Sequence, residues 1–296
     1  MRKVVLFFAG CIILIGCEKK ITIKQGPYTS KPSIQCLLEP DSFPRLFLNA
    51  TQPFLTANVN TGNMVIRNAS VKISSNFGVD LLALDSIYDR IYCRYNYFYT
   101  GTKKIQKNTT YTLEITANGE TYIATTTTDN IACSIDSIGY TTSFKDLYGE
   151  HEGVIVYFKD VPNVLNYYRF EMLRQVDSTM RHAKIQLSGS CLANDTVFLT
   201  EYGRSVYSDI NLNGQQLKLV IEPAYSHRAG TKSYVLVQSI DKATYDFFDQ
   251  LDKQKLAQNN PFVEPVFIKD GQFGKKAIGF FGSVIHSAPV YFEFPE

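Results

Sequence analysis

The chain has 296 residues, with 30 Lys and Arg against 28 Asp and Glu. Its charges are scattered along the sequence, so it lacks the clustered basic face that nucleic-acid binding requires, and we exclude that class of partner. The content of 19 Tyr and 20 Phe, in a chain dense in Thr and Val, favours a mainly β fold, because aromatic and β-branched side chains suit half-buried sheet surfaces.

The N-terminal segment predicts a bacterial lipoprotein signal. Arg2 and Lys3 precede an apolar run, residues 4–15, that is too short to span a bilayer as a permanent helix. The small residue Gly16 lies directly before Cys17, which suits a signal peptidase that cuts there once the thiol carries lipid. We therefore expect residues 1–16 to be removed and Cys17 to hold the mature chain on the membrane through acyl chains. The alternatives are an ordinary secretory signal with an incidental cysteine and an N-terminal membrane anchor.

The mature chain is expected to comprise a tether and two domains. Loss of residues 1–16 leaves 28 basic against 28 acidic residues, so the mature chain is formally neutral. Its length exceeds that of a typical single domain, which makes two domains the expectation. Residues 17–32 are polar and contain Gly26-Pro27 and Pro32, a composition typical of a lipidated tether. The two predicted domains follow at residues 33–130 and 131–296.

The first domain is predicted to be an immunoglobulin-like β-sandwich. Apolar alternation predicts strands at residues 34–38, 45–49, 71–73, 89–99, 111–115 and 121–125. The last two flank Asn118-Gly119, and Asn-Gly between alternating strands is the strongest short hairpin signal. About seven short strands in under a hundred residues fit a sandwich of this kind.

The second domain is predicted to be β-rich with one helix. Strands are expected at residues 135–138, 154–158, 167–173, 184–187, 196–199, 217–221, 234–238 and 289–294. A helix is expected near residues 241–258, because Ser239 or Asp241 can cap its first turn and Phe247 belongs to an apolar repeat of every fourth residue. Pro261 should end it. We expect the side with Phe247 and Phe248 to pack on the sheet.

Four cysteines remain once the signal is removed and Cys17 carries lipid. They are Cys36, Cys93, Cys133 and Cys191, and four cysteines can pair in three ways. No two have the Cys-x-x-Cys spacing, so the sequence supports neither a zinc site nor a thioredoxin-type redox site. Outside the cytoplasm disulfides are permitted, and we expect pairing within domains, Cys36 with Cys93 and Cys133 with Cys191. The alternative is that these cysteines are small buried thiols that pack as hydrophobes.

The sequence contains none of the spacings that common catalytic and cofactor sites impose. There is no His-Glu-x-x-His, Gly-x-Ser-x-Gly, phosphate-binding Gly-rich loop or EF-hand calcium loop. The densest group of potential ligands is Glu150-His151-Glu152, but sequence neighbours in a turn point apart, so we expect a solvated loop. We therefore expect no enzyme activity, no metal and no cofactor.

An aromatic stretch is the nearest approach to a ligand-binding surface. Tyr92, Tyr95, Tyr97 and Phe98 could form a platform on which a sugar stacks. However, Tyr95 and Tyr97 belong to a period-two series over residues 91–99, which is typical of the core face of a strand. Tyr92 and Phe98 are then the exposed candidates for ligand contact.

Several stretches together carry a resemblance that covers the chain from Cys17 to the C-terminus. They are ASVKI at residues 69–73, TYTLEI at 110–115, IDSI at 135–138, NYYRF at 166–170, SIDKATY at 239–245, NPF at 260–262 and GFFG at 279–282. In order and spacing they resemble the Bacteroidota outer-membrane lipoproteins of domain-of-unknown-function family 4249. The resemblance implies a sandwich like the carboxypeptidase regulatory domain followed by a β-rich half, and a TonB-dependent outer-membrane receptor as partner. It transfers no catalytic residue.

Three functions from different classes remain open. The first is an accessory binding lipoprotein of an outer-membrane transporter; the second is a structural or adhesion lipoprotein; the third, a hydrolase, would need residues that converge from distant strands. A cleft with converging polar groups would favour the first or third, and flat faces the second. We expect attachment to the outer membrane through lipid at Cys17. Glu18 is followed by two lysines, so an acidic surface-export signal is weak, and the face of the membrane and the oligomeric state stay open.

Overall fold

The computed structural model describes residues 28–53, 64–146, 149–177, 191–192, 195–222, 228–259 and 268–296. Within these ranges the chain forms fifteen β-strands and one α-helix, which confirms the mainly β class with a single helix. The strands of the first half are β1 Pro32–Leu38, β2 Arg45–Ala50, β3 Ser70–Ser75, β4 Gly78–Asp89, β5 Arg94–Thr100, β6 Thr110–Ala117 and β7 Glu120–Thr127. The second half contains β8 Ser134–Asp146, β9 Gly149–Lys159, β10 Tyr167–Val176, β11 Val197–Ser208, β12 Gln216–Ile221, β13 Lys232–Ile240, α2 Lys242–Asn259, β14 Ile278–His286 and β15 Val290–Glu293.

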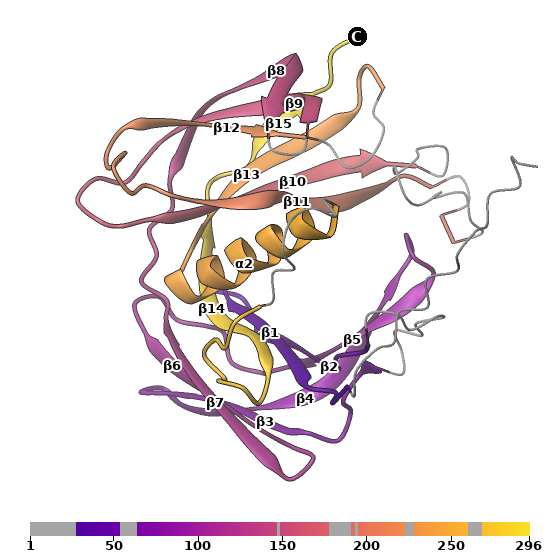
Figure 1. Ribbon diagram of the computed structural model, residues 1–296, viewed down its shortest axis with the longest axis vertical. Helices are drawn as coiled ribbons and strands as arrows, with labels where there is room; N and C mark the ends of the chain where they lie inside the picture. The colour runs from indigo at the N-terminus through magenta and orange to yellow at the C-terminus, as the bar shows by residue number, and fades with distance from the viewer. Residues whose placement is uncertain are drawn as a thin grey trace, which may run out of the picture.

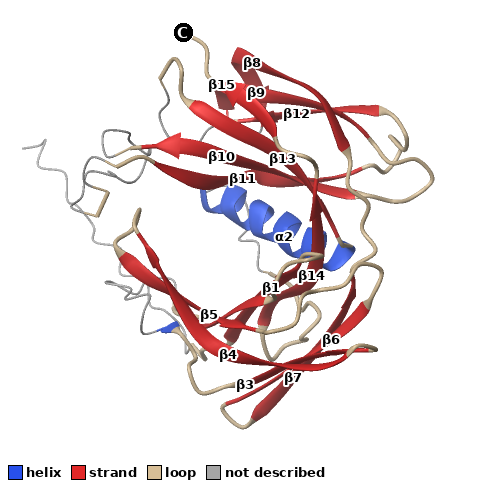
Figure 2. Cartoon of the chain, turned by 180° about the vertical axis from the view of Figure 1, so that it is seen from behind, coloured by secondary structure: helices blue, strands red, loops and turns tan. Residues whose placement is uncertain are grey.

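Most strands belong to one long sheet. Its order is β11-β10-β13-β14-β1-β2-β5-β4-β3-β6-β7, with β15 paired to β13, and a separate three-stranded sheet has the order β12-β9-β8. Figures 1 and 2 show that the long sheet bends around α2, which lies between β10 and β11 on one side and β14 and β1 on the other. The three-stranded sheet forms the outermost layer beyond β10 and β13. Both halves of the molecule therefore share one continuous sheet.

The first core lies where the strands from β14 and β1 to β7 curl over. The expected alternation in β1 is confirmed, since Ile34, Cys36 and Leu38 are each at most 1% exposed. They pack with alternate residues of the other strands, among them Leu48, Val71, Ile73, Leu113 and Ile115. Because side chains alternate between the two faces of a strand, the residues between these point away from the first core.

The hairpin predicted at Asn118-Gly119 is confirmed. Both residues have positive φ angles, 52° and 81°, as the two-residue turn between twisted antiparallel strands requires. The flanking strands β6 and β7 pair in register, with Ile115 opposite Tyr122.

The long strand predicted over residues 89–99 is wrong. The chain instead turns between β4 and β5, and β4 itself was not predicted. Asp89 fixes this turn, because one carboxylate oxygen accepts hydrogen bonds from the backbone N–H groups of Ile91 and Tyr92, at 2.9 and 3.1 Å. Aspartate side chains commonly nucleate turns in this way. The aromatic run hid the turn, since it continues the β-type composition across it.

Strand β14 joins the two halves and was also not predicted. It pairs in parallel with β1 and antiparallel with β13. Gln272 ties it to the far edge of the first half: its side chain accepts from the Phe281 N–H at 2.7 Å, donates to the Phe281 carbonyl at 2.9 Å and also donates to the Thr125 carbonyl at 3.3 Å. The first core thus contains Phe281 from the C-terminal part of the chain. The domain boundary near residue 130 and the immunoglobulin-like assignment stay predictions.

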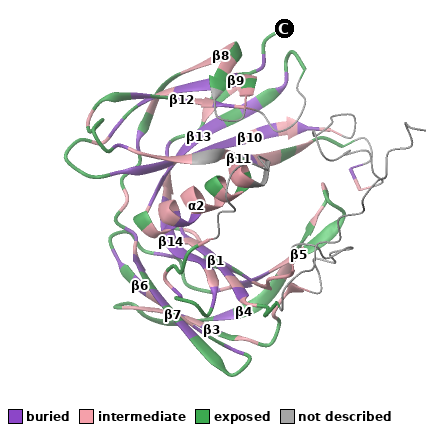
Figure 3. Cartoon of the chain, viewed as in Figure 1, coloured by how far each residue is buried: buried purple, intermediate pink, exposed green. Residues whose placement is uncertain are grey.

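The second core lies between the three-stranded sheet and the long sheet. Val154, Val156 and Phe158 of β9 face Tyr168, Phe170 and Met172 of β10, and all six are fully buried. Figure 3 shows buried residues following β10, β13, β14 and β1 through the middle of the molecule. Arg174 is buried in this half and pairs with Glu201 at 2.7 Å, so its charge is compensated.

Helix α2 matches the prediction at its start and on its buried face. Asp241 accepts the Thr244 N–H at 2.9 Å and is therefore the N-cap. Phe247 is 8% exposed, and its ring centroid lies 5.0 Å from that of Phe280 on β14. The close approach requires glycine at position 282, because an added Cβ would lie 1.9 Å from the Thr244 hydroxyl oxygen. The strand expected at residues 184–187 and the stop at Pro261 lie outside the described residues.

Candidate functional site

The face of the long sheet that carries α2 is called the inner face here, and the two cores lie on the opposite face. Phe281 of β14 and Val237 of β13 point to the cores, whereas Phe280 packs against α2. On this inner face two groups of residues stand out, a cluster of charged side chains and an open cleft. Neighbouring parts of the chain contribute to both groups. Gln35 of β1 lines the cleft, and Glu39, directly after β1, belongs to the charged cluster.

The charge cluster consists of Glu39, Arg169, Glu171, Gln238 and His286. Strand register places three of these residues side by side. Arg169 of β10 lies opposite Gln238 of β13, and Gln238 lies opposite His286 of β14. His286 Nδ1 lies 2.7 Å from Glu39 Oε1, and His286 Nε2 lies 2.8 Å from Glu171 Oε2. Gln238 also donates to Glu171 at 2.7 Å.

The two carboxylates keep His286 protonated. Burial by itself lowers the pKa of His286, but the hydrogen bonds to Glu171 and Glu39 outweigh it and raise the pKa to about 9. The same hydrogen bond from His286 lowers the pKa of Glu39. Because both ring nitrogens then donate to carboxylates, His286 has no lone pair with which to act as a general base.

Arg169 completes the charge cluster beside the helix. Its guanidinium carbon lies 3.9 Å from the Phe248 ring centroid and 4.2 Å from that of Tyr202, which is a cation–π arrangement on two rings. Burial lowers the pKa of Arg169 to about 10, so the side chain is still charged at neutral pH. The charge cluster therefore links β10, β13, β14 and the segment after β1 by compensated charges.

The sequence singled out one group of potential metal ligands, Glu150-His151-Glu152. Within the described ranges no three histidine, cysteine, aspartate or glutamate side chains gather closely enough to hold a metal ion. The solvated loop predicted for Glu150-His151-Glu152 is wrong, because the three residues begin strand β9. His151 Nδ1 lies 3.2 Å from Glu222 Oε1, and Glu150 and Glu152 are exposed.

The cleft lies on the first half, where β2 and β5 separate. These strands pair only at Arg45 with Thr100 and Leu46 with Tyr99, and a cleft of about 530 Å³ opens beyond that point. It is lined by Ser33, Gln35, Phe47, Asn49, Ala50, Thr51, Gln52, Met64, Val65, Arg94, Tyr95, Asn96 and Tyr97. Aromatic rings, side-chain amides and one guanidinium thus face a common space of the size that small ligands occupy.

Two side chains of the cleft favour a polar ligand. The Gln52 side-chain oxygen is buried without a hydrogen-bond partner in the described structure, and such a group is costly unless a ligand or water satisfies it. Tyr95 is 56% exposed, and its ring neighbours Tyr88 and Tyr97 lie 5.1 and 6.4 Å away between ring centroids, so an exposed aromatic surface borders the cleft. Arg67 covers the Tyr97 ring at 4.0 Å and fixes its position.

The aromatic candidates predicted from sequence are only partly correct. Tyr92 is exposed as expected, with the Arg94 guanidinium 5.1 Å from its ring centroid. The expected exposure of Phe98 is wrong, because Phe98 is 6% exposed and packs on Phe47 with Arg45 above its ring. The core position expected for Tyr95 is also wrong. The turn at residues 90–93 breaks the period of two on which these assignments depended.

The predicted disulfide pairing is wrong. Cys93 in the β4–β5 turn pairs with Cys191 in the segment between β10 and β11, across 98 residues of sequence and a Cα–Cα distance of 5.6 Å. Cys36 and Cys133 are free and belong to the first and second cores, as the buried-thiol alternative proposed. Burial raises the pKa of both thiols, that of Cys133 to about 12.

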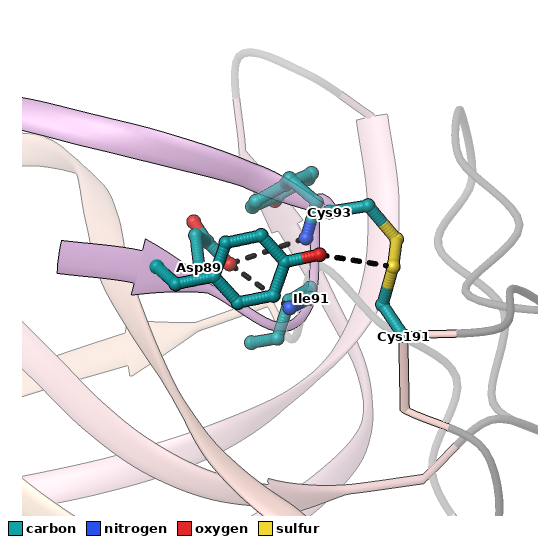
Figure 4. The surroundings of a disulfide bond; sticks show 6 residues. Asp89, Ile91, Cys93 and Cys191 are labelled. Atoms are coloured by element: carbon teal, nitrogen blue, oxygen red, sulfur yellow. Dashed lines mark hydrogen bonds between the residues drawn. A yellow bond between two sulfur atoms is a disulfide. The ribbon is translucent and has the colours of Figure 1, made fainter.

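The disulfide therefore connects the two halves. Figure 4 shows the surroundings of the bridge, where the Tyr88 hydroxyl lies 3.4 Å from Cys191 Sγ and Asp89 holds the turn. An ion pair between Arg90 and Asp195 crosses at the same place. Together these contacts fix the hairpin of β4 and β5, one wall of which lines the cleft.

Gly16 and Cys17 lie outside the described residues, so the lipidation site stays a prediction. No helix in the described part of the chain is long and apolar enough to cross a membrane. No curated protein matches the sequence. A family model described as domain of unknown function (DUF4249) matches residues 18–284, which is nearly the whole length, and the chain belongs to this family.

Proposed function

We propose that the chain is a lipid-anchored binding protein of the cell envelope, which holds a polar, hydroxyl-bearing ligand in the cleft and works beside an outer-membrane TonB-dependent transporter. The anchor is supported by Gly16 and Cys17 after a short apolar run. The binding role is carried by the cleft between β2 and β5. Origin in Bacteroidota and the immunoglobulin-like character of residues 33–130 are parts of the same proposal.

The chemistry of the cleft supports a ligand of the carbohydrate class. Stacking on Tyr95 matches the apolar face of a sugar ring, and the amides of Gln35, Asn49 and Asn96 can each donate to and accept from hydroxyl groups. Arg94 adds a guanidinium, whose N–H groups can donate hydrogen bonds to ligand oxygens. A protein that only captures a ligand needs such groups and no nucleophile.

A non-catalytic role is supported by the charge cluster. His286 is the histidine most enclosed by carboxylates in the described structure, and both of its nitrogens are engaged by Glu39 and Glu171. A base in this state cannot accept a proton from a substrate. The sequence also lacks catalytic motifs.

A structural or adhesion role is the second candidate, supported by the outer surface of β4. Val79 and Leu81 are 52% and 69% exposed, and Ile123 on β7 lies on the same face through the pairings of Lys72 and Glu114. Exposed apolar side chains of this kind commonly mark contacts with other proteins. Affinity capture of the native lipoprotein from solubilised outer membrane separates the two roles, since reproducible recovery of a transporter supports the first.

Ligand binding in the cleft is tested by calorimetric titration with a panel of soluble oligosaccharides. We expect one of them to bind, and Tyr95→Ala to weaken its affinity about 10-fold through loss of stacking. Tyr234→Ala is the matched control, because Tyr234 is an exposed tyrosine on β13 and does not line the cleft. Absence of binding by the whole panel, or equal weakening by both variants, would remove the cleft from the proposal.

A further inference from the structure

Two loops of the second half bring oxygen atoms to one point. Residues 160–166 connect β9 to β10, and residues 209–215 connect β11 to β12. The Asn166 Nδ2 atom has four oxygens around it, namely the carbonyls of Val161 and Val164 at 2.8 and 2.9 Å, Asp160 Oδ1 at 3.3 Å and Asp209 Oδ2 at 3.4 Å. An amide nitrogen carries two hydrogens, so it cannot donate to all four.

The two carboxylates at this point are buried without a basic partner. Asp160 and Asp209 are each 1% exposed, and no described Lys, Arg or His forms an ion pair with either. In addition, Asp209 Oδ1 has no hydrogen-bond partner in the described structure. Buried carboxylates are costly unless they are paired or coordinate a metal ion.

The sequence of the second loop independently suggests a cation. Residues 209–214 are Asp-Ile-Asn-Leu-Asn-Gly, which matches the first half of the calcium-loop pattern, including glycine at the sixth position for the sharp turn. Gly214 has a φ of +72°. Val220 stands where the complete EF-hand loop has glutamate, so a second carboxylate must come from elsewhere. Asp160 contacts this loop directly, because it accepts the Gly214 N–H at 2.7 Å.

Tyr168 orients the Asp160 carboxylate. Its hydroxyl donates to Asp160 Oδ1 at 2.5 Å, and groups next to metal ligands commonly orient them in this way. Asn166 needs only to turn its amide over to place its oxygen where its nitrogen lies. That oxygen would be about 3 Å from the four others, which is the spacing of ligands around one Ca²⁺ with Ca–O distances of ~2.4 Å.

We propose that the loops at 160–166 and 209–215 form a Ca²⁺ site in which Asp160, Asp209, the Asn166 amide oxygen and the carbonyls of Val161 and Val164 are ligands. All of these are hard oxygen donors in an irregular arrangement, which suits Ca²⁺ better than Mg²⁺, since Mg²⁺ demands octahedral geometry and retains water. A pocket of about 220 Å³ is lined in part by Val164 and Asn166 and lies next to the two loops, although neither Asp160 nor Asp209 lines it. The ion would cross-link the two loops at the end of the second core, whatever ligand the cleft binds.

The test uses the full chain, purified in detergent and treated with EDTA. We expect 1 mM CaCl₂ to raise its Tm by about 5 °C and 1 mM MgCl₂ to have little effect. Terbium provides a readout on the wild type alone, because Tyr168 contacts Asp160 and should sensitise bound Tb³⁺, which Ca²⁺ then displaces. Two results would overturn the proposal. One is an unchanged Tm with Ca²⁺ together with no Tb³⁺ luminescence that Ca²⁺ displaces; the other is an equal rise of the Tm with Mg²⁺.

Variants locate the site. Asp209→Asn keeps the shape of the side chain, and we expect it to lower Ca²⁺ affinity at least about 10-fold by calorimetry while leaving the Tm in EDTA unchanged or higher, since an uncompensated charge is removed. Asp195→Asn is the matched control, because Asp195 is an exposed aspartate paired with Arg90, and it should bind Ca²⁺ as the wild type does. Wild-type affinity in Asp209→Asn would place any bound Ca²⁺ elsewhere and overturn the assignment.

Discussion

His286 joins residues from distant parts of the sequence through charge. Its two carboxylate partners come from the segment after β1 and from β10, so the imidazolium connects the first half of the chain to the second. The side chain of Glu39 is 41% exposed and that of Glu171 is 10% exposed, so loss of His286 would leave Glu171 buried without its imidazolium partner, which is costly. The cluster therefore stabilises the bend of the long sheet around α2.

The pKa of His286 predicts a pH dependence of stability. The folded pKa, about 9, exceeds the unfolded value near 6.5, so the folded state binds the proton more tightly. The stabilisation is fully present below pH 6.5 and is lost as the pH rises through 9. We expect the free energy of unfolding in urea to fall by on the order of 3 kcal/mol across that range.

Two variants isolate His286 as the cause. His286→Gln can hydrogen-bond but cannot be charged, and its unfolding free energy should no longer fall between pH 6.5 and 9. His151→Gln removes the histidine paired with Glu222 and should keep the wild-type slope. A wild-type slope in His286→Gln would mean that another group carries the dependence.

At the same scale, sequence alone identified some residues and not others. Tyr92 is exposed as predicted, but because it lies in the β4–β5 turn and not on the outer face of a strand. Burial of Phe98 depends on Phe47, fifty-one positions away. The partners of His286 are likewise set by strand order and not by spacing. The first half of the calcium pattern at residues 209–214 could be found in the sequence, but Asp160 could not, because only the fold brings it there.

At the scale of elements, an aromatic cluster packs α2 against β14, with Phe247 and Phe248 both in contact with Phe280. Phe247 packs on Phe248 and on Phe280 of β14, and its exposed fraction of 8% makes it a core residue. We expect Phe247→Ala to lower the free energy of unfolding by roughly 3 to 5 kcal/mol, through lost burial and the cavity that remains. Chemical denaturation followed by circular dichroism measures this change.

The control for this prediction is the same substitution at an exposed position. Phe43 is 51% exposed, and Phe43→Ala should change the free energy of unfolding by less than about 1 kcal/mol. A loss below about 1 kcal/mol in Phe247→Ala would mean that the contact of Phe247 with Phe280 contributes little to stability.

Elements with local signals were predictable, and those defined by long-range pairing were not. Asp241 as N-cap and Asn118-Gly119 as turn act within a few residues, so α2 and the β6–β7 hairpin follow from the sequence. Strand β14 has a glycine at position 279 and pairs in parallel with β1, more than 200 residues earlier, which no local pattern encodes. The same holds for the disulfide, since the cysteines that pair lie on loops and those that stay free lie on core faces.

For the whole molecule, the bridge between Cys93 and Cys191 limits how far the two halves can separate. The bridge closes a loop of about one hundred residues, and a loop of that size is expected to stabilise the folded state substantially by restricting the unfolded chain. The cleft lies beside the hairpin that carries Cys93. Its walls are therefore held by β1, by β2 and by the disulfide-bridged hairpin of β4 and β5. Such preorganisation favours ligand binding, since less order is lost on association.

The reach of the folded part from the membrane follows from where the tether ends. Residues 28–31 are held on Thr51. The Tyr28 hydroxyl donates to the Thr51 hydroxyl at 2.5 Å, and the Lys31 N–H donates to the same hydroxyl at 2.9 Å. On the proposed lipidation at Cys17, residues 18–27 separate the lipid from the fold, and ten residues span at most about 33 Å. Under that proposal, any membrane partner would contact the folded part within this distance of the bilayer.

The anchor itself is tested by Cys17→Ala, which should move the protein from the membrane to the soluble fraction, because a tether without acyl chains has no affinity for the bilayer. Ser30→Ala, a substitution of similar size just beyond the tether, is the control and should stay membrane-bound.

Protease shaving of intact cells then distinguishes the two faces of the outer membrane. Digestion alongside a known surface protein, with a cytosolic marker intact, would place the chain outside; full protection would place it on the periplasmic leaflet, where the 33 Å tether allows contact only with the periplasmic rim of a transporter. Unchanged fractionation of Cys17→Ala would contradict lipid anchoring and, with it, this limit on reach.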